Sequence, residues 1–214
     1  MTTTLARMGA GFADPVHGAQ QTFRALLVAM SEPGRLHALP ASATDGLATE
    51  DTEMRPPLDV AMSATLLTLL DADTPVHLAG TLGNDEARGW LRFHTGARAV
   101  PSVTGMTAAL AGDVDAALWS RLDPGTDDVP QAGATLFVEV DALSEQPRPD
   151  GIALTLHGAG IETSRRLVVA GLSDAFWRWR VALQPELPRG IDLVLVCGRQ
   201  LAAIPRSTRI TFEA

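Results

Sequence analysis

The stretch from Leu187 to Phe212, LPRGIDLVLVCGRQLAAIPRSTRITF, constrains the fold more than any other part of this chain. Its centre, Ile191 to Cys197, is an almost continuous apolar run that is rich in Leu and β-branched residues and is followed by Gly198. A short apolar run between turn residues predicts a strand that is buried on both faces. Such strands belong to sheets covered by helices on both sides. The alternating run Thr208 to Phe212 predicts a further strand.

Helical and strand patterns alternate along the rest of the chain. Asp14-Pro15 predicts the start of the first helix, because Asp caps helices and Pro suits the first helical position. The apolar residues that recur at helical spacing in this helix are expected to form its core face: Val16, Ala19, Phe23, Leu26, Leu27 and Met30. Pro56-Pro57 predicts the start of a second helix, and Asn84 and Ser173 predict the caps of two others. Strands are expected at Ala134–Val140 and Gly151–His157, among others.

This alternation predicts the α/β class with a mostly parallel or mixed sheet. The length of 214 residues fits one domain over residues 1–214. Residues 1–11 are expected to form a flexible N-terminus.

Composition excludes several functions. All 17 basic residues are Arg, so no Lys can form a pyridoxal-phosphate Schiff base or serve a phosphate-binding loop. The single cysteine, Cys197, excludes an internal disulfide and a cysteine-based metal site. A net charge of -8 argues against nucleic acid as a partner. We expect no metal and no cofactor. No apolar run reaches the ~20 residues of a membrane span, and the N-terminus lacks the apolar core of a signal peptide, which favours a cytoplasmic location.

A candidate anion-binding site combines a glycine-rich turn with arginines. Gly158-Ala159-Gly160 directly follows the strand that ends at His157, and backbone N–H groups in such a turn can hold an anion. Arg189 and Arg206 each follow a proline at the edges of the Ile191–Cys197 strand, and Arg suits bidentate contact with phosphate. The competing interpretations are a tight turn, a structural histidine and ion-paired surface arginines.

Trp177-Arg178-Trp179-Arg180 suggests a protein–protein surface. Residues two apart diverge on a helix, so the two tryptophans cannot share one face. With Phe176, Trp179 and Leu183 in the core, Trp177 is expected to face outward beside Arg178. Exposed Trp and Arg are typical anchors of interfaces.

Six motifs in order resemble one family, over about residues 12 to 212. The segment FADPVHGAQQTFRALLVAMSEPG resembles its opening signature, and the rest are LLTLLDADTP, Pro130-Gln131-Ala132-Gly133-Ala134-Thr135-Leu136, LHGAGI, LPRGIDLVLV and IPRST. The family is that of the H subunit of the carbon–phosphorus lyase system for phosphonate use. Its usual Gly-Pro-Gly-Ile turn is Gly158-Ala159-Gly160-Ile161 here.

The resemblance implies a three-layer αβα sandwich with a mixed sheet, similar to the pyridoxal-phosphate-dependent transferases but without the cofactor. It also implies a homodimer that joins the G, I and J subunits in a larger assembly. That assembly makes ribose 1-methylphosphonate 5-triphosphate from ATP and methylphosphonate, and a different subunit later cleaves the carbon–phosphorus bond.

Two kinds of function therefore stand side by side. The first is a non-catalytic subunit of this complex, since no complete catalytic set is recognisable in the sequence. The second is an independent enzyme or ligand-binding module that acts on an anionic substrate through His157 and the turn after it.

Overall fold

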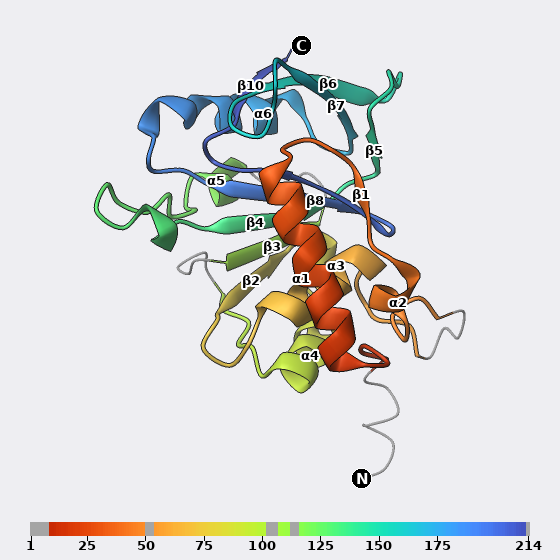
Figure 1. Cartoon of the computed structure of the whole chain (residues 1–214). Helices are drawn as coiled ribbons and strands as arrows, with labels where there is room; N and C mark the ends of the chain where they lie inside the picture. Colours follow the sequence, from red (N-terminus) through yellow and green to blue (C-terminus); the bar gives the residue numbers. More distant parts are fainter. Residues whose placement is uncertain (1–8, 50–53, 102–106, 112–115, 213–214) are drawn as a thin grey trace.

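The computed structural model describes residues 9–49, 54–101, 107–111 and 116–212, which form helices and two sheets (Figure 1). The elements in chain order are α1 (Pro15–Ser31), β1 (His37–Ala38), α2 (Ala41–Thr44), α3 (Val60–Leu69), β2 (Val76–Ala79), the 3-10 helix η2 (Gly80–Leu82), α4 (Asp85–Thr95), β3 (Thr107–Ala111), α5 (Ala116–Trp119), η3 (Pro130–Ala132), β4 (Thr135–Glu139), β5 (Ala142–Ser144), β6 (Gly151–His157), β7 (Arg165–Ala170), α6 (Asp174–Ala182), η4 (Gln184–Glu186), β8 (Asp192–Cys197), β9 (Gln200–Ile204) and β10 (Arg209–Phe212).

The larger sheet has six strands in the order β1-β9-β8-β4-β3-β2. Its strands β2, β3, β4 and β8 are parallel, whereas β9 and β1 continue the sheet antiparallel. The smaller sheet has the order β10-β6-β7-β5 and is wholly antiparallel. The α/β class with a mixed sheet is thus confirmed, and a second, antiparallel sheet is added to it.

Strand β8 lies inside the larger sheet, between β4 and β9, and is buried on both faces as predicted. Leu193 and Leu195 point to one hydrophobic cluster, and Val194 and Val196 point to the other. The alternation of side chains along a strand explains why one apolar run serves two cores.

The two faces of the larger sheet are covered differently. Helices α1, α3 and α4 supply residues to the cluster on one face. The other face packs against the smaller sheet together with α5 and α6, which occupy the upper part of the view (Figure 1). The expectation of helices alone on both faces is therefore wrong. Strand β6 shows the reason, because Leu154 and Leu156 are buried while Thr155 and His157 are exposed, which is the pattern of a sheet with one covered face.

Three predicted helix caps are confirmed. Asp14 accepts hydrogen bonds from two backbone N–H groups at the start of α1, and Asn84 and Ser173 cap α4 and α6. The predicted start at Pro56-Pro57 is wrong, since α3 begins at Val60 with Asp59 as its cap. An acidic side chain that can accept the first free N–H groups sets the start more strongly than the prolines before it.

The C-terminal stretch contributes to both sheets. Strands β8 and β9 form a hairpin in which Cys197 pairs with Gln200, and β9 was not predicted. The strand predicted at Thr208–Phe212 is confirmed as β10, but it pairs with β6 in the smaller sheet. The turn from Pro205 to Thr208 thus carries the chain from one sheet to the other.

The predicted flexible N-terminus is only partly within the described residues. Residues 9–11 are held beside α4, where the Ala10 N–H donates to Met54 O at 2.7 Å and Trp90 Nε1 donates to Ala10 O at 3.1 Å. Residues 1–8 lie outside the described part of the chain. No helix of the described residues is long and apolar enough to span a bilayer.

Candidate functional site

Arg206 forms an ion pair with Asp192 at the amino end of β8. Its Nε lies 3.2 and 3.1 Å from the two carboxylate oxygens, Nη2 also donates to Oδ2, and the backbone N–H donates to Oδ1 at 2.7 Å. Nη1 donates to Pro130 O. Both side chains are largely buried. Asp192 already pairs with this guanidinium. The role of Arg206 in anion binding stays a prediction.

A second guanidinium, that of Arg180, lies close to the same carboxylate. Arg180 is buried and donates from Nη2 to Pro205 O at 3.0 Å, while its Nε has no partner among the described residues. Burial lowers the pKa of Arg180 to about 10, Asp192 opposes the shift and Arg206 adds to it. One carboxylate therefore compensates two largely buried cations, where α6, β8 and the Pro205–Thr208 turn meet.

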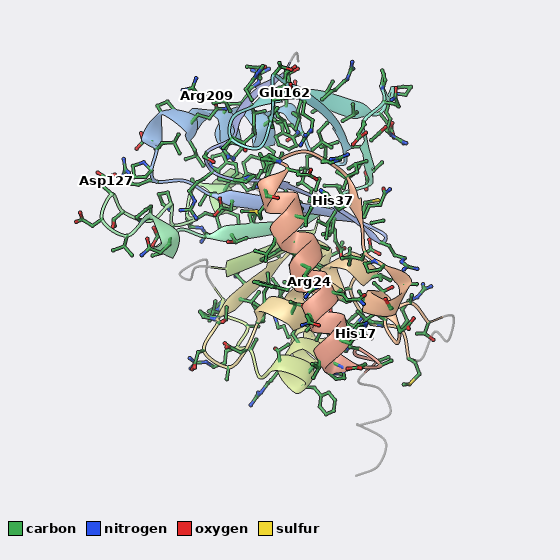
Figure 2. The ribbon with its side chains drawn as sticks, in the orientation of Figure 1. His17, Arg24, His37, Asp127, Glu162 and Arg209 are labelled. Atoms are coloured by element: carbon green, nitrogen blue, oxygen red, sulfur yellow. The ribbon has the colours of Figure 1, made fainter. Side chains whose placement is uncertain are left out.

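Arg189 holds a loop in place. It pairs with Glu186 and lies 3.3 Å from Asp127, while Gly190 N donates to Pro124 O at 2.9 Å. Figure 2 shows Asp127 far out on this loop. Together with the hydrogen bond from Arg206 to Pro130 O, these contacts fix the loop of residues 123–133 against the start of β8. Both arginines that were predicted to bind an anion, Arg189 and Arg206, thus have carboxylate partners.

The glycine-rich turn after β6 is closely packed. A Cβ on Gly160, whose φ is +78°, would lie 2.1 Å from Ser31 O, and one on Gly158 would lie 3.4 Å from Ser207 O. His157 is exposed, with Nδ1 2.9 Å from Thr163 O. The turn touches the carbonyl end of α1, where the helix dipole is negative and disfavours an anion. Close packing explains Gly160 and a φ of +140° explains Gly158, and the anion site of His157, Gly158 and Gly160 stays a prediction.

The expectation that Trp177 faces outward is wrong. Trp177 is fully buried and packs edge-to-face on Phe176, with ring centroids 5.1 Å apart. Trp179 is only partly buried, and Arg178 alone of the predicted pair is exposed, 3.7 Å from Asp174. Phe176, Trp177 and Arg180 point inward because the buried network around Asp192 draws Arg180 into the core. An interface anchored by Trp177 is therefore excluded in this fold.

The carboxyl ends of β4 and β8 bring together acidic groups that the sequence analysis missed. Glu139 Oε1 accepts from Asp59 N at 2.9 Å, and Asp59 Oδ2 accepts from Gly198 N. Burial raises the pKa of Glu139. The hydrogen bond from Asp59 N opposes this rise, and the charge of Asp59 adds to it. Burial also raises the pKa of Cys197, with Asp59 and Asp141 adding to it, so its thiol is poorly suited to act as a nucleophile.

Glu139→Gln is expected to stabilise the protein slightly at neutral pH. A carboxyl group whose pKa is raised by folding favours the folded state when protonated, so stability falls as the pH rises through that pKa. Gln keeps the acceptor for Asp59 N without the charge. Thermal unfolding at pH 7.5 should show a Tm higher by about 2 °C, and the difference from the wild type should vanish near pH 4. A lower Tm at pH 7.5 contradicts this assignment.

A hollow of about 580 Å³ lies beside Asp59 and is lined by residues 47–49 and 55–60. Its charged lining side chains are Arg55 and Asp59. Among the residues that the structure describes, no group of three or more His, Cys, Asp and Glu side chains could hold a metal ion. The described carboxyl edge thus offers no recognisable set of nucleophile, base and oxyanion donors.

The most conspicuous surface feature is the outward side of α1, which the sequence analysis assigned to the core. Val16 is 80% exposed, Phe23 46% and Leu27 54%. The residues that α1 buries are mostly small: Gly18, Thr22, Leu26 and Ala29. The predicted core face is therefore wrong for Val16, Phe23 and Leu27. Small side chains let the helix lie close to the sheet and α3, and this turns the large apolar side chains toward solvent.

Comparison with known proteins identifies the family of this chain. Residues 10–211 match a family described as "Bacterial phosphonate metabolism protein (PhnH)". The chain is 34% identical over 215 residues, the full length of both proteins, to the "Alpha-D-ribose 1-methylphosphonate 5-triphosphate synthase subunit PhnH" of Rhizobium meliloti (strain 1021). It is 30% identical to the "Putative C-P lyase subunit protein HtxG" of Stutzerimonas stutzeri, over 91% of this chain and 86% of that protein. The chain belongs to the PhnH family of bacterial phosphonate metabolism proteins.

Proposed function

We propose that this protein is a subunit of the complex that makes ribose 1-methylphosphonate 5-triphosphate from ATP and methylphosphonate in the carbon–phosphorus lyase pathway. The observation that carries the proposal is the full-length match to a subunit of that name. Two related sequences that are both named as subunits support membership of an assembly more than an independent enzyme.

The subunit itself is non-catalytic in this proposal. The chain has no lysine, and the described basic side chains of the candidate site, Arg189 and Arg206, are paired with carboxylates. A residue that acts on ATP or methylphosphonate needs a free charge or an activated nucleophile. The second candidate function is a module that binds anionic ligands. Only the exposed His157 and the turn after it still support that function.

The finer features that the resemblance implies belong to the same proposal. They are a fold similar to the pyridoxal-phosphate-dependent transferases, a homodimer, and binding to the G, I and J subunits. The exposed apolar side of α1 supports a protein contact of some kind, because monomers rarely expose such a stripe.

Growth and co-purification test the proposal. In a host that depends on methylphosphonate as its only phosphorus source, deletion of the gene for this chain should abolish growth, and a plasmid copy should restore it. A tagged full-length chain should recover the G, I and J subunits in comparable amounts. Growth without the chain, or recovery of none of these subunits, overturns the proposal. Nucleotide binding and turnover by the isolated chain instead support the module for anionic ligands.

A further inference from the structure

The outer face of α1 is defined here by five exposed residues, Val16, Gln20, Phe23, Arg24 and Leu27. Val16, Gln20, Phe23 and Leu27 follow each other at intervals of four, three and four residues, so they form one stripe along the helix. Arg24 and His17 lie along its edge, and Figure 2 marks both on α1. The helix has 17 residues and is about 25 Å long, which makes this stripe a continuous ridge.

The charge distribution indicates what can cover this ridge. The chain has a net charge of -8, so two copies repel each other over most of their surfaces. From Pro15 to Ser31, however, α1 contains no Asp or Glu, and Arg24 is its only formally charged residue. The outer face of α1 is therefore a place where two copies can approach with little repulsion.

An antiparallel pair of α1 helices also brings opposite charges together. With a twofold axis between Ala19 and Gln20, Phe23 of one copy lies opposite Val16 of the other. Arg24 then comes within reach of the other copy's Asp14, the exposed N-cap at the opposite end of the stripe. Within the described residues no hydrogen bond or ion pair engages Arg24, and Asp14 uses only Oδ1 to cap α1. Each copy thus offers one cation and one carboxylate at the spacing that an isologous contact needs.

We infer that the outer face of α1 is the dimer interface, with two antiparallel α1 helices packed across a twofold axis beside Gln20. The inference rests on the homodimer proposed above and names its surface. Phe93 of α4 is 52% exposed and lies next to His94, which contacts Gly11 just before α1. Figure 1 shows α4 near the N-terminal end of α1, so Phe93 extends the apolar surface at the place where the partner's helix ends.

Substitution of the ridge tests the surface. Light scattering after size exclusion should show a wild-type dimer at micromolar concentration. Phe23→Glu should weaken the dimer by about 100-fold or more, since each dimer loses two apolar side chains and gains two carboxylates in an apolar contact. Circular dichroism and Tm should stay close to wild type because Phe23 is not part of the core. Arg178→Glu, an exposed change on α6, is the matched control and should leave the dimer intact.

Two further measurements test the antiparallel geometry. Asp14→Ser keeps a capping side chain but removes the charge, and it should weaken the dimer by a factor similar to that of Arg24→Ala. The double variant should be no weaker than either single variant, because both changes break the same ion pair. In a Cys197→Ser background, Gln20→Cys should form a covalent dimer on oxidation, whereas Arg178→Cys should not.

The outcomes separate this inference from the proposed function. A monomeric wild type, a Phe23→Glu dimer of unchanged affinity, or no cross-link at Gln20→Cys overturns the α1 interface. A monomer that still co-purifies with the G, I and J subunits overturns the interface and leaves the proposed function standing. A dimer that depends on Phe23 but recovers no partner subunit supports the interface and contradicts the proposed function.

Discussion

Asp192→Ala should lower the free energy of unfolding by about 3–5 kcal/mol, and the Tm by about 10 °C. The substitution removes every carboxylate contact of Arg206 and the main opposing charge near Arg180. Two guanidinium groups with little solvent access would then lack a counter-charge, and loss of one partner from such a group is far more costly than loss of an exposed pair. Urea unfolding followed by tryptophan fluorescence measures the change.

Asp150→Ala is the matched control. Asp150 accepts two hydrogen bonds from Arg148, at 3.0 and 2.8 Å, in a pair that is exposed. Its removal should change the free energy of unfolding by no more than about 0.5 kcal/mol. If Asp192→Ala costs no more than Asp150→Ala, the Arg180–Asp192–Arg206 network does not stabilise the fold.

Trp177→Ala should cost about 3–5 kcal/mol of stability and leave the dimer affinity of the remaining folded protein unchanged. The indole fills the core between the two sheets and contacts Phe176, so its loss leaves a large cavity. An exposed interface anchor would give the opposite pattern, with a stable protein and weaker association. Chemical denaturation and light scattering on the same samples distinguish the two.

Trp179→Ala serves as the comparison for Trp177→Ala. Trp179 is partly buried against Trp119 and Phe176, with centroid distances of 5.8 and 5.4 Å. Its truncation should cost roughly half as much, because less surface leaves water on folding. An equal or larger loss at Trp179 would contradict the assignment of faces on α6.

The sequence predicted elements better than it predicted which side of each helix is buried. Strands β4, β6 and β8 and the caps of α1, α4 and α6 depend on local composition and short-range hydrogen bonds, which the sequence displays directly. The buried side of α1 does not depend on local composition alone, because apolar residues such as Val16, Leu26 and Leu27 lie around most of the helix. Periodicity then fails to identify one face, and the small Gly18 and Ala29 decide which side can approach the sheet.

The candidate site shows the same limit for a different reason. Arg180 is buried beside Asp192 of β8 and Pro205 of the turn after β9, and only the folded chain brings these partners to α6. A charged residue beside two tryptophans predicts a surface, and nothing local signals the partners that compensate it. Glu139 and Asp59 are 80 residues apart and meet only because β4 ends where α3 begins.

The strand order of the larger sheet has a consequence for synthesis. Strands β8 and β9 stand between β4 and β1, so His37 pairs with Leu201 across almost the whole chain. While β8 and β9 are still inside the ribosome, β4 of the nascent chain has an open edge and β1 has no partner strand. Open edges recruit other strands, so such chains are prone to aggregate. The larger sheet can therefore close only after both β8 and β9 have left the ribosome, and a chain arrested before that point keeps its hydrophobic strand edges exposed.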